Sequence, residues 1–285
     1  MIRTLASRYI RILIVMIFSK KFLLRHFGLV AVGEQNRLLR FPVWLTLDVV
    51  GKPDYKIKVD DDFRFPFDDK SIRAIYTSHN LEHLTLEAAH SLIAEAYRIL
   101  KPGGELLIDV PCAKKAFSML CLYLENPLNI SFLKYVSGLD IHRHSLEQSY
   151  KMVPENRNVP KDWVSHPFNM IINGIIACFM DPPYASSHLP VIHDPAIIEK
   201  KLKSLSMDDF FDFIFSSLPN GHRYTGGHCE AWYDDKLSAL LSSYGFSTQL
   251  RFHKESRTLP PILVPDRQFS RRDQWSLKVS AIKPR

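Results

Sequence analysis

An alternation of strands and a helix between Phe41 and Pro111 constrains the fold of this 285-residue chain more than any other feature. The segment ELLIDVP, residues 105–111, is apolar almost throughout, which is typical of a strand buried on both faces of a parallel sheet. It follows TLEAAHSLIAEAYRIL, residues 85–100, whose apolar residues recur at helical spacing. Because strands that alternate with helices form parallel sheets covered by those helices, the pattern predicts an α/β fold.

Three strands are expected before this helix, at residues 41–50, 54–60 and 71–79. The first ends in Asp48, ahead of a turn at Gly51-Lys52-Pro53. Thr85 is a good N-cap for the helix, and Pro102-Gly103-Gly104 are expected to stop it. The residues expected on its inner face are Leu86, Ala89, Ile93, Tyr97 and Leu100.

The end of the chain returns to regular structure. Residues 233–246 predict a helix with Asp234 as candidate N-cap and Gly245 as its stop, with Leu237, Leu240, Leu241 and Tyr244 facing inward. Residues 247–255 and 274–284 then predict an antiparallel pair of strands at the sheet edge. These elements predict an α/β fold with a mostly parallel sheet covered by helices.

Residues 113–228 interrupt this alternation with many prolines, histidines and aromatic residues. We interpret them as an irregular helical insertion that covers the ligand-binding edge of the sheet as a lid. Apolar anchors indicate that it is folded: Trp163, Phe168, Phe179 and Tyr184. The expected organisation is therefore a basic segment at 1–28 and one domain at 29–285, interrupted by 113–228.

Polar residues gather where the expected parallel strands end. They are Asp48, the loop at 60–62, residues 78–83 and residues 109–112. Ligands of such sheets bind outside the carboxyl ends of the strands. The sequence thus predicts one ligand crevice formed by these four segments.

The N-terminal segment, residues 1–28, carries several arginines and lysines, and no acidic residue precedes Glu34. Its uninterrupted apolar run, Ile12–Phe18, is far shorter than the ~20 residues that span a bilayer. It also lacks the small-residue cleavage site of a signal peptide. Two interpretations remain: a basic amphipathic helix on an anionic membrane face, or a helix packed on the core with a solvated basic edge.

Bulk composition indicates the class of protein, its compartment and the charge of its partners. A hydrophobic fraction of 46% with 24% charged residues is typical of a globular protein. The four cysteines form no C-x-x-C pair, so we expect a reduced, cytoplasmic protein, in peripheral contact with the inner face of the membrane if residues 1–28 bind there. The net charge of +7 favours anionic neighbours, either nucleic acid or acidic lipid.

The run from DVVGKPDYKIKVDDD to AYRILKPGGELLIDVP resembles the class I S-adenosylmethionine-dependent methyltransferases of the type 11 family, specifically over Trp44 to Pro111. FPFDDKSIRAIYTSHNLEHL is similar to the family's loop, fourth strand and following turn. HCEAWYDDKLSALLSSYGF and DQWSLKVSAIKP are similar to the closing helix and last strand of the branch found beside polysaccharide biosynthesis. About half of the chain is covered, and the insertion is not.

The resemblance implies an α/β, Rossmann-like, doubly wound, mostly parallel seven-stranded sheet, in which LVAVGEQNR occupies the place of the first strand and its loop. It also implies S-adenosylmethionine as cofactor and assigns residues to it. Asp48 would accept hydrogen bonds from the ribose hydroxyls, since a carboxylate can accept two at once. Asp61 would flank the adenine, while Ser78, His79 and Glu82 would surround the methionine part. The alternatives are a turn-forming role for Asp48, and capping or solvation of the helix start by Glu82 and His83.

The expected glycine-rich loop is degenerate. In the family the first strand ends in a G-x-G-like loop, which lets the chain pass close under the cofactor and offers its amides. Here LVAVGEQNR occupies this place, so that Gly33 matches one family glycine while Glu34 and Gln35 stand where small residues are expected. A catalytically inactive relative with a scaffold or binding role is therefore the alternative to an enzyme, and cofactor titration would separate them.

The resemblance implies methyl transfer to a small-molecule or saccharide acceptor, with O-methylation as the expected reaction. A hydroxyl acceptor is helped by a general base, for which histidine is the usual residue. The first candidates are His142 and His144, followed by His79 and His228, and for each of them a surface or structural role is the alternative. HRYTGGHCE, residues 222–230, fits no standard zinc spacing, so no metal is expected.

A nucleic-acid methyltransferase or binder is the second alternative, suggested by the basic charge. An amino-methylating enzyme of this type would carry a [DNS]-P-P-[YFW] motif after the fourth strand. The chain has DPPY only at Asp181–Tyr184, inside the insertion. Its basic residues also concentrate at the two termini rather than interleaving with aromatic residues, which argues against a nucleic-acid groove.

Overall fold

The computed structural model describes residues 19–33, 43–49, 51–137, 159–176, 192–218, 228–250, 258–259 and 275–285. Several predicted features lie outside these ranges: most of the basic segment 1–28, Glu34, Gln35, the histidine pair His142 and His144, and the anchors Phe179 and Tyr184. The chain divides into two compact units. The first comprises Met1–Val110, Asp235–Gln268 and Leu277–Arg285, and the second comprises Pro111–Asp234 and Phe269–Ser276.

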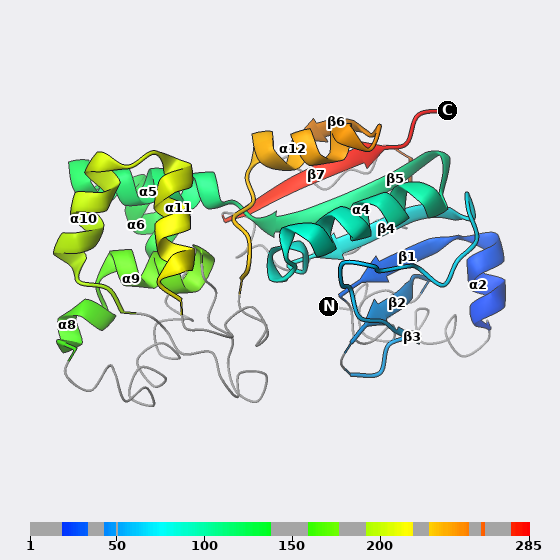
Figure 1. Ribbon diagram of the computed structural model, residues 1–285, viewed down its shortest axis with the longest axis horizontal. Coiled ribbons are helices and arrows are strands. Elements are labelled where there is room, and N and C mark those ends of the chain that lie inside the picture. The colour runs from blue at the N-terminus through cyan, green and yellow to red at the C-terminus, as the bar shows by residue number, and fades with distance from the viewer. Residues whose placement is uncertain are drawn as a thin grey trace, which may run out of the picture. The chain divides into compact units, whose positions relative to one another are not determined.

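A seven-stranded sheet with the order β3-β2-β1-β4-β5-β7-β6 forms the frame (Figure 1). β2, β1, β4 and β5 run parallel with β3, while β6 and β7 pair antiparallel. The strands are β1 Leu29–Val32, β2 Leu45–Asp48, β3 Tyr55–Lys56, β4 Ile72–Ser78, β5 Leu100–Pro111, β6 Ser247–Leu250 and β7 Ser276–Ile282. The predicted mostly parallel sheet with an antiparallel edge pair is confirmed.

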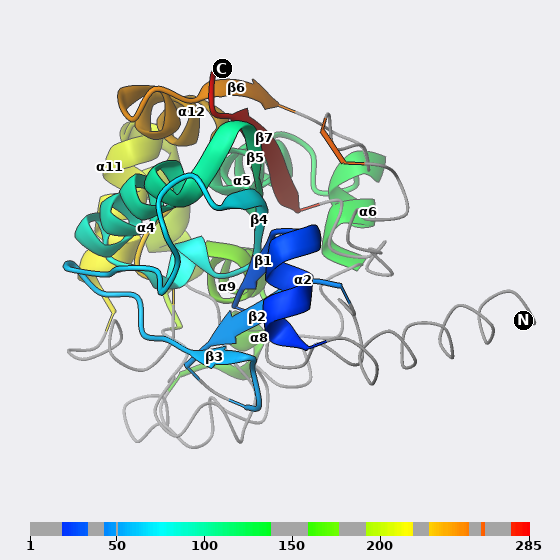
Figure 2. The same ribbon diagram turned by 90° about the vertical axis from the view of Figure 1, so that its right-hand side faces the viewer.

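Helices cover both faces of this sheet. Figure 2 shows α4 (Leu86–Ile99) and α12 (Asp234–Ser243) on one face and α2 (Lys20–His26) on the other. β1 is buried along its whole length, as a central strand with two covered faces must be. An apolar cluster of the first unit includes Trp44, whose ring meets the Tyr76 ring edge-on with the centroids 6.3 Å apart.

Helix α4 follows the predicted pattern at its start and departs from it in detail. The Thr85 hydroxyl accepts a hydrogen bond from the Ala88 amide, as expected of an N-cap. The predicted inner position Leu86 is wrong, because this side chain is 40% exposed. It lies in the first turn, at the margin of the buried stripe, which consists of Ala88, Ala89, Leu92, Ile93, Ala96 and Ile99.

The Pro-Gly-Gly segment does not end the helix, as the sequence suggested. Helix α4 ends at Ile99 and β5 begins at Leu100 at once. The Lys283 ammonium, from the end of the chain, donates to the Tyr97 carbonyl at 2.6 Å and the Leu100 carbonyl at 2.9 Å. A cation at the carbonyl end of a helix satisfies its last acceptors and its dipole.

Residues 102–104 lie inside β5 instead, as an irregularity in its pairing with β4. The register moves from Ile72 opposite Leu100 to Ala74 opposite Glu105. At Gly104 a Cβ atom would lie 2.8 Å from the Lys101 carbonyl oxygen, so the bulge requires glycine there.

The second unit is helical and has a hydrophobic core of its own, to which Phe168 belongs and against which Trp163 packs. Its helices are α5 Ala113–Glu125, α6 Ile130–Ser137, α8 Lys161–Val164, α9 Pro167–Ile171, α10 Pro195–Ser204 and α11 Met207–Ser216, with a π-helical segment at Ile172–Ile176. Its expected role as a lid stays a prediction. No helix within the described ranges has both the length and the apolar character to cross a membrane.

His193 is a half-buried titratable group of this unit. The Asn169 side chain makes two hydrogen bonds to the His193 backbone. Its Oδ1 accepts from the His193 amide at 2.9 Å, and its Nδ2 donates to the His193 carbonyl at 2.8 Å. The Ser217 hydroxyl lies 3.3 Å from Nε2. Burial lowers the pKa of His193 from 6.5 to about 4, because the charged imidazolium is poorly solvated there.

The lowered pKa of His193 predicts that the folded protein loses stability in acid. Between pH 6.5 and about 4 the unfolded chain protonates His193 while the folded chain does not. The stabilisation is thus fully present above pH 6.5 and is lost as the pH falls toward 4, by up to about 3 kcal/mol. Urea unfolding of the wild type and of His193→Gln at several pH values should show a flatter acid limb for the variant. An equal fall of the unfolding free energy with pH in both proteins would contradict the lowered pKa of His193.

Candidate cofactor site

The carboxyl ends of β1, β2, β4 and β5 lie at one edge of the first unit, because these strands are parallel. Gly33 follows β1, Asp48 is the last residue of β2, and Ser78 is the last residue of β4. Ser78 pairs in register with Asp109 of β5. The structure therefore brings these predicted polar positions to the same edge.

Gly33 occupies a position that only glycine fits well. Its φ is +78°, in the left-handed region, and its amide donates to the Leu47 carbonyl at 2.8 Å. A Cβ atom here would lie 3.0 Å from the Asn80 Cβ and 3.1 Å from its Cγ. The turn after β1 thus needs glycine for its backbone conformation and for the close approach of the Asn80 side chain.

Asn80 is a site residue that the sequence analysis did not single out. Its Nδ2 is buried and has no hydrogen-bond partner among the described residues. A buried amide donor without a partner costs about 1–3 kcal/mol. Such a donor beside the glycine turn is suited to a polar ligand. The sequence could have identified it by its place two residues after the end of β4, within the expected ligand loop.

His79 and Glu82 form a polar turn after β4. His79 has a φ of +49°, which is strained for a residue other than glycine, and its amide donates to the Asp109 carbonyl at 2.7 Å. Its Nδ1 lies 3.3 Å from Glu82 Oε1, and His83 Nε2 lies 3.9 Å from the same oxygen. Glu82 is only 1% exposed, so it is held between two imidazoles rather than solvated at the helix start.

Asp48 and Asp61 hold different positions around the edge. Asp48 is half-buried, and its carbonyl accepts from the Ile57 amide at 3.1 Å. Asp61 is exposed, and its Oδ1 accepts from the Thr85 hydroxyl at 3.3 Å. Its carbonyl accepts from the Ser91 hydroxyl. Asp61 therefore anchors its loop to the start of α4, a structural role that the sequence did not indicate.

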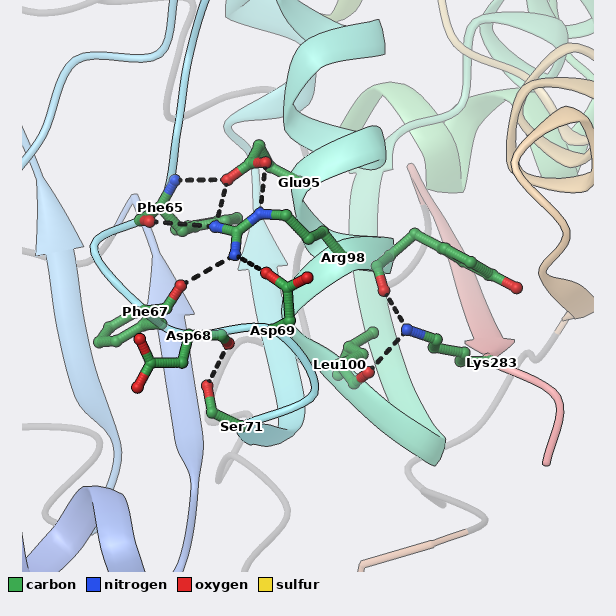
Figure 3. A network of polar contacts seen from close by, with 10 residues as sticks. Phe65, Phe67, Asp68, Asp69, Ser71, Glu95, Arg98, Leu100 and Lys283 are labelled. Atoms are coloured by element: carbon green, nitrogen blue, oxygen red, sulfur yellow. Dashed lines mark hydrogen bonds and ion pairs between the residues drawn. The ribbon is translucent and has the colours of Figure 1, made fainter.

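A guanidinium fixes the loop that continues from Asp61 toward β4 (Figure 3). Arg98 donates to Glu95 and Asp69 at 2.7 and 2.6 Å, and to the carbonyls of Phe65 and Phe67. Burial alone would raise the pKa of Glu95, but hydrogen bonds from Arg98 and from the Phe65 amide outweigh it and lower the pKa. The loop beside the edge is thus held rigidly on α4.

Of the other histidines proposed as bases, one belongs to the second unit and two lie outside the described residues. His228 belongs to the second unit, is 3% exposed and has its Nδ1 3.2 Å from the Ile176 carbonyl oxygen. This contact gives His228 a structural partner. His142 and His144 lie outside the described residues, so their role as bases stays a prediction.

The sheet order, the antiparallel β6–β7 pair and the polar carboxyl edge are those of the Rossmann-like methyltransferase fold. Residues 47–108, from β2 into β5, match the family model described as a methyltransferase domain. The match covers well under half of the chain. No curated protein matches the sequence.

Similar solved structures include three methyltransferase structures. A complex of the Haloferax volcanii Trm112 methyltransferase activator with a methyltransferase is 10% identical over 93% of this chain and 88% of that chain, with a TM-score of 0.35. A Thermotoga maritima S-adenosylmethionine-dependent methyltransferase is 12% identical over 98% and 96%, with a TM-score of 0.35. A Bacillus halodurans protein described as a methyltransferase is 14% identical over 90% of each, with a TM-score of 0.25. With TM-scores this low, these likenesses carry no argument of their own.

The methyl donor that a methyltransferase domain implies is S-adenosylmethionine, and the described edge fits it. The glycine turn at Gly33 allows close backbone approach, and Asp48 supplies a carboxylate at the end of β2. The buried Nδ2 of Asn80 offers a donor that nothing else in the described chain uses. These three residues would hold the cofactor.

Gly33 needs both a left-handed backbone and room for the Asn80 side chain. Its replacement by alanine should therefore cost more stability than replacement of a left-handed glycine that lacks such a contact. Gly103 is a matched control, because its φ is +77° while an added Cβ would meet only the Arg285 side chain, at 3.6 Å. Gly103→Ala should cost about 1 kcal/mol and Gly33→Ala about 2–3 kcal/mol, the excess arising from the Asn80 contact. Equal losses in chemical denaturation would disprove the crowding at Asn80.

Proposed function

We propose that this protein transfers a methyl group from S-adenosylmethionine to a hydroxyl of a small-molecule or saccharide acceptor. The observation that carries the proposal is the carboxyl edge of the matched segment, where Asp48 and the buried donor of Asn80 flank the turn at Gly33. Bound S-adenosylmethionine supplies a methyl group activated by a positively charged sulfur. The protein itself has to align the acceptor and exclude water.

Each edge residue has a role that its chemistry supports. Asp48 would accept hydrogen bonds from the two ribose hydroxyls, and Asp61 would flank the adenine from its anchored loop. Ser78 and His79 would surround the methionine part, where Glu82 holds the His79 ring at 3.3 Å. Because the loop from 63 to 70 is tied to α4 through Arg98, this side of the site is preorganised.

Acceptor recognition is assigned to residues 113–228. These residues supply most of the hydrophobic core of the second unit, and the segment follows directly from β5. Removal of a hydroxyl proton needs a base, and His142 and His144 are the proposed residues, with His79 as the reserve candidate. The similarity to the polysaccharide-associated branch favours a saccharide hydroxyl as the acceptor.

Asp48 provides the direct test of cofactor binding. Asp48→Ala removes a charged acceptor and should weaken S-adenosylmethionine binding by about 1.5–3 kcal/mol in isothermal titration. Asp68→Ala, at an exposed aspartate in the turn before β4, is the matched control and should bind like the wild type. A wild type that binds neither S-adenosylmethionine nor its demethylated product would instead indicate a catalytically inactive scaffold.

The two insertion histidines provide the test of catalysis. The paired variant His142→Gln/His144→Gln should lower the rate of tritium transfer from labelled S-adenosylmethionine to a responsive saccharide by about 100-fold, the scale of general-base catalysis. Its cofactor affinity should be unchanged, because the proposed base contacts only the acceptor. Retained turnover in this variant would move the base to His79 or Asp109.

A further inference from the structure

Asp54 closes the junction between β2 and β3 in the first unit. Its side chain is 7% exposed, and its Oδ2 accepts from the Thr46 amide at 3.0 Å and from the Thr46 hydroxyl at 3.2 Å. The Asp54 amide in turn donates to the Thr46 hydroxyl oxygen at 3.1 Å. Thr46 is fully buried, so these bonds satisfy polar groups that water does not reach.

The Asp54 carboxylate extends a very short ladder between the two strands. β3 is two residues long, and it pairs with β2 through Leu47 opposite Tyr55 and Asp48 opposite Lys56. Thr46 lies one residue before this pairing begins, and its amide donates to the Asp54 side chain instead of a strand carbonyl. A two-residue ladder supplies few hydrogen bonds to fix its own register. The register of β2 against β3 therefore depends on Asp54 as well.

Thr46 and Asp48 share one face of β2, because side chains two residues apart on a strand point the same way. Asp48 is the last residue of the strand, and its carbonyl accepts from the Ile57 amide at 3.1 Å. A shift of the backbone at Thr46 is thus passed on to Asp48. A carboxylate that accepts from two ribose hydroxyls has to be held within about 0.5 Å of its place.

Helix α2 supports the same junction through a partly exposed cation. The Lys20 ammonium donates to the Asp54 carbonyl at 2.5 Å and lies 3.9 Å from Asp54 Oδ1. It also lies over the Tyr55 ring, 5.1 Å from the centroid. The two carboxylate oxygens therefore have different partners, since Oδ1 faces Lys20 and Oδ2 faces Thr46. An asparagine can supply the oxygen toward Thr46 without the charge toward Lys20.

We propose that Asp54 is a positioning residue for the cofactor. Through Thr46 it holds Asp48 where the Asp48 carboxylate accepts from the ribose of S-adenosylmethionine. The inference rests on the proposed function, because it takes Asp48 as the ribose ligand. Asp54 does not contact the cofactor itself, and it acts on binding through the end of β2.

A double-mutant cycle, measured by isothermal titration of the full-length protein with S-adenosylmethionine, tests the proposal. Asp54→Ala should weaken binding about tenfold, since Asp48 is then no longer held in place. In the Asp48→Ala background the same change should weaken binding by less than about twofold, because the residue through which Asp54 acts is gone. Equal losses in the two backgrounds would overturn the proposal. So would an Asp54→Ala protein that binds like the wild type.

The conservative variant Asp54→Asn separates the Thr46 bonds from the charge. It keeps an oxygen toward Thr46 and loses the attraction to Lys20, and pairs with an exposed partner contribute little. Its affinity for S-adenosylmethionine should therefore stay within about twofold of the wild type. A loss as large as that of Asp54→Ala would overturn the proposal, because the charge would then be responsible.

Thr46→Val and Ser280→Ala compare positioning with a general loss of stability. Each removes a buried hydroxyl that donates to a carboxylate, at 3.2 Å to Asp54 and at 2.5 Å to Glu105. In the sheet, β1, β4 and β5 separate Ser280 on β7 from β2. Both variants should unfold at lower urea concentration, but only Thr46→Val should bind S-adenosylmethionine more weakly, by about fivefold. Equal titrations of the two variants would overturn the proposal, and this comparison replaces the cycle if Asp54→Ala does not fold.

The same titrations distinguish this inference from the function on which it rests. A wild type that binds no S-adenosylmethionine, or an Asp48→Ala protein that binds like the wild type, overturns the proposed cofactor site together with the inference. Binding that depends on Asp48 but not on Asp54 overturns the inference alone.

Discussion

The placement of β4 between β1 and β5 is the constraint on which the candidate site depends. β4 pairs with β1 up to Val32 opposite Thr77, and with β5 up to Ser78 opposite Asp109. Because all three strands are parallel, the residues after β1 and β4 emerge next to each other, and Asn80 comes to lie against Gly33. A one-residue slip would turn every side chain to the other face and separate them.

Buried charge in the first unit is handled by local partners. Glu82 is held between His79 and His83. Glu105, which is fully buried on β5, accepts from the Ser280 hydroxyl at 2.5 Å and the Thr258 hydroxyl at 2.8 Å. Glu105 thereby exchanges water for two hydroxyl donors, as burial of an acidic group requires, whereas Glu82 has only the two imidazole nitrogens, 3.3 and 3.9 Å from its Oε1. Glu105 is thus tied to neighbouring segments, while the buried Nδ2 of Asn80 at the site edge has no hydrogen-bond partner among the described residues.

The sequence predicted the site in outline and missed its packing. Asp48 was identifiable because it ends an expected strand, where ligands of parallel sheets bind, and Gly33 because it matches a glycine of the family's loop. Asn80 was not identified, since nothing in the residue type distinguishes a buried amide from one in a solvated turn. Leu86 was assigned to the core because it falls at helical spacing, but spacing does not say where along the helix the sheet ends.

What the sequence by itself determined is the local order of elements: the strand ending at Asp48, the capped helix after Thr85 and the antiparallel pair at the end of the chain. These depend on short-range effects, namely side-chain periodicity and capping. Tertiary structure alone decided that Lys283 caps α4, that Pro102–Gly104 form a bulge within β5, and that Lys20 of α2 donates to Asp54. Each of these depends on which distant segment packs against which, and the pattern of residues along the chain does not encode that directly.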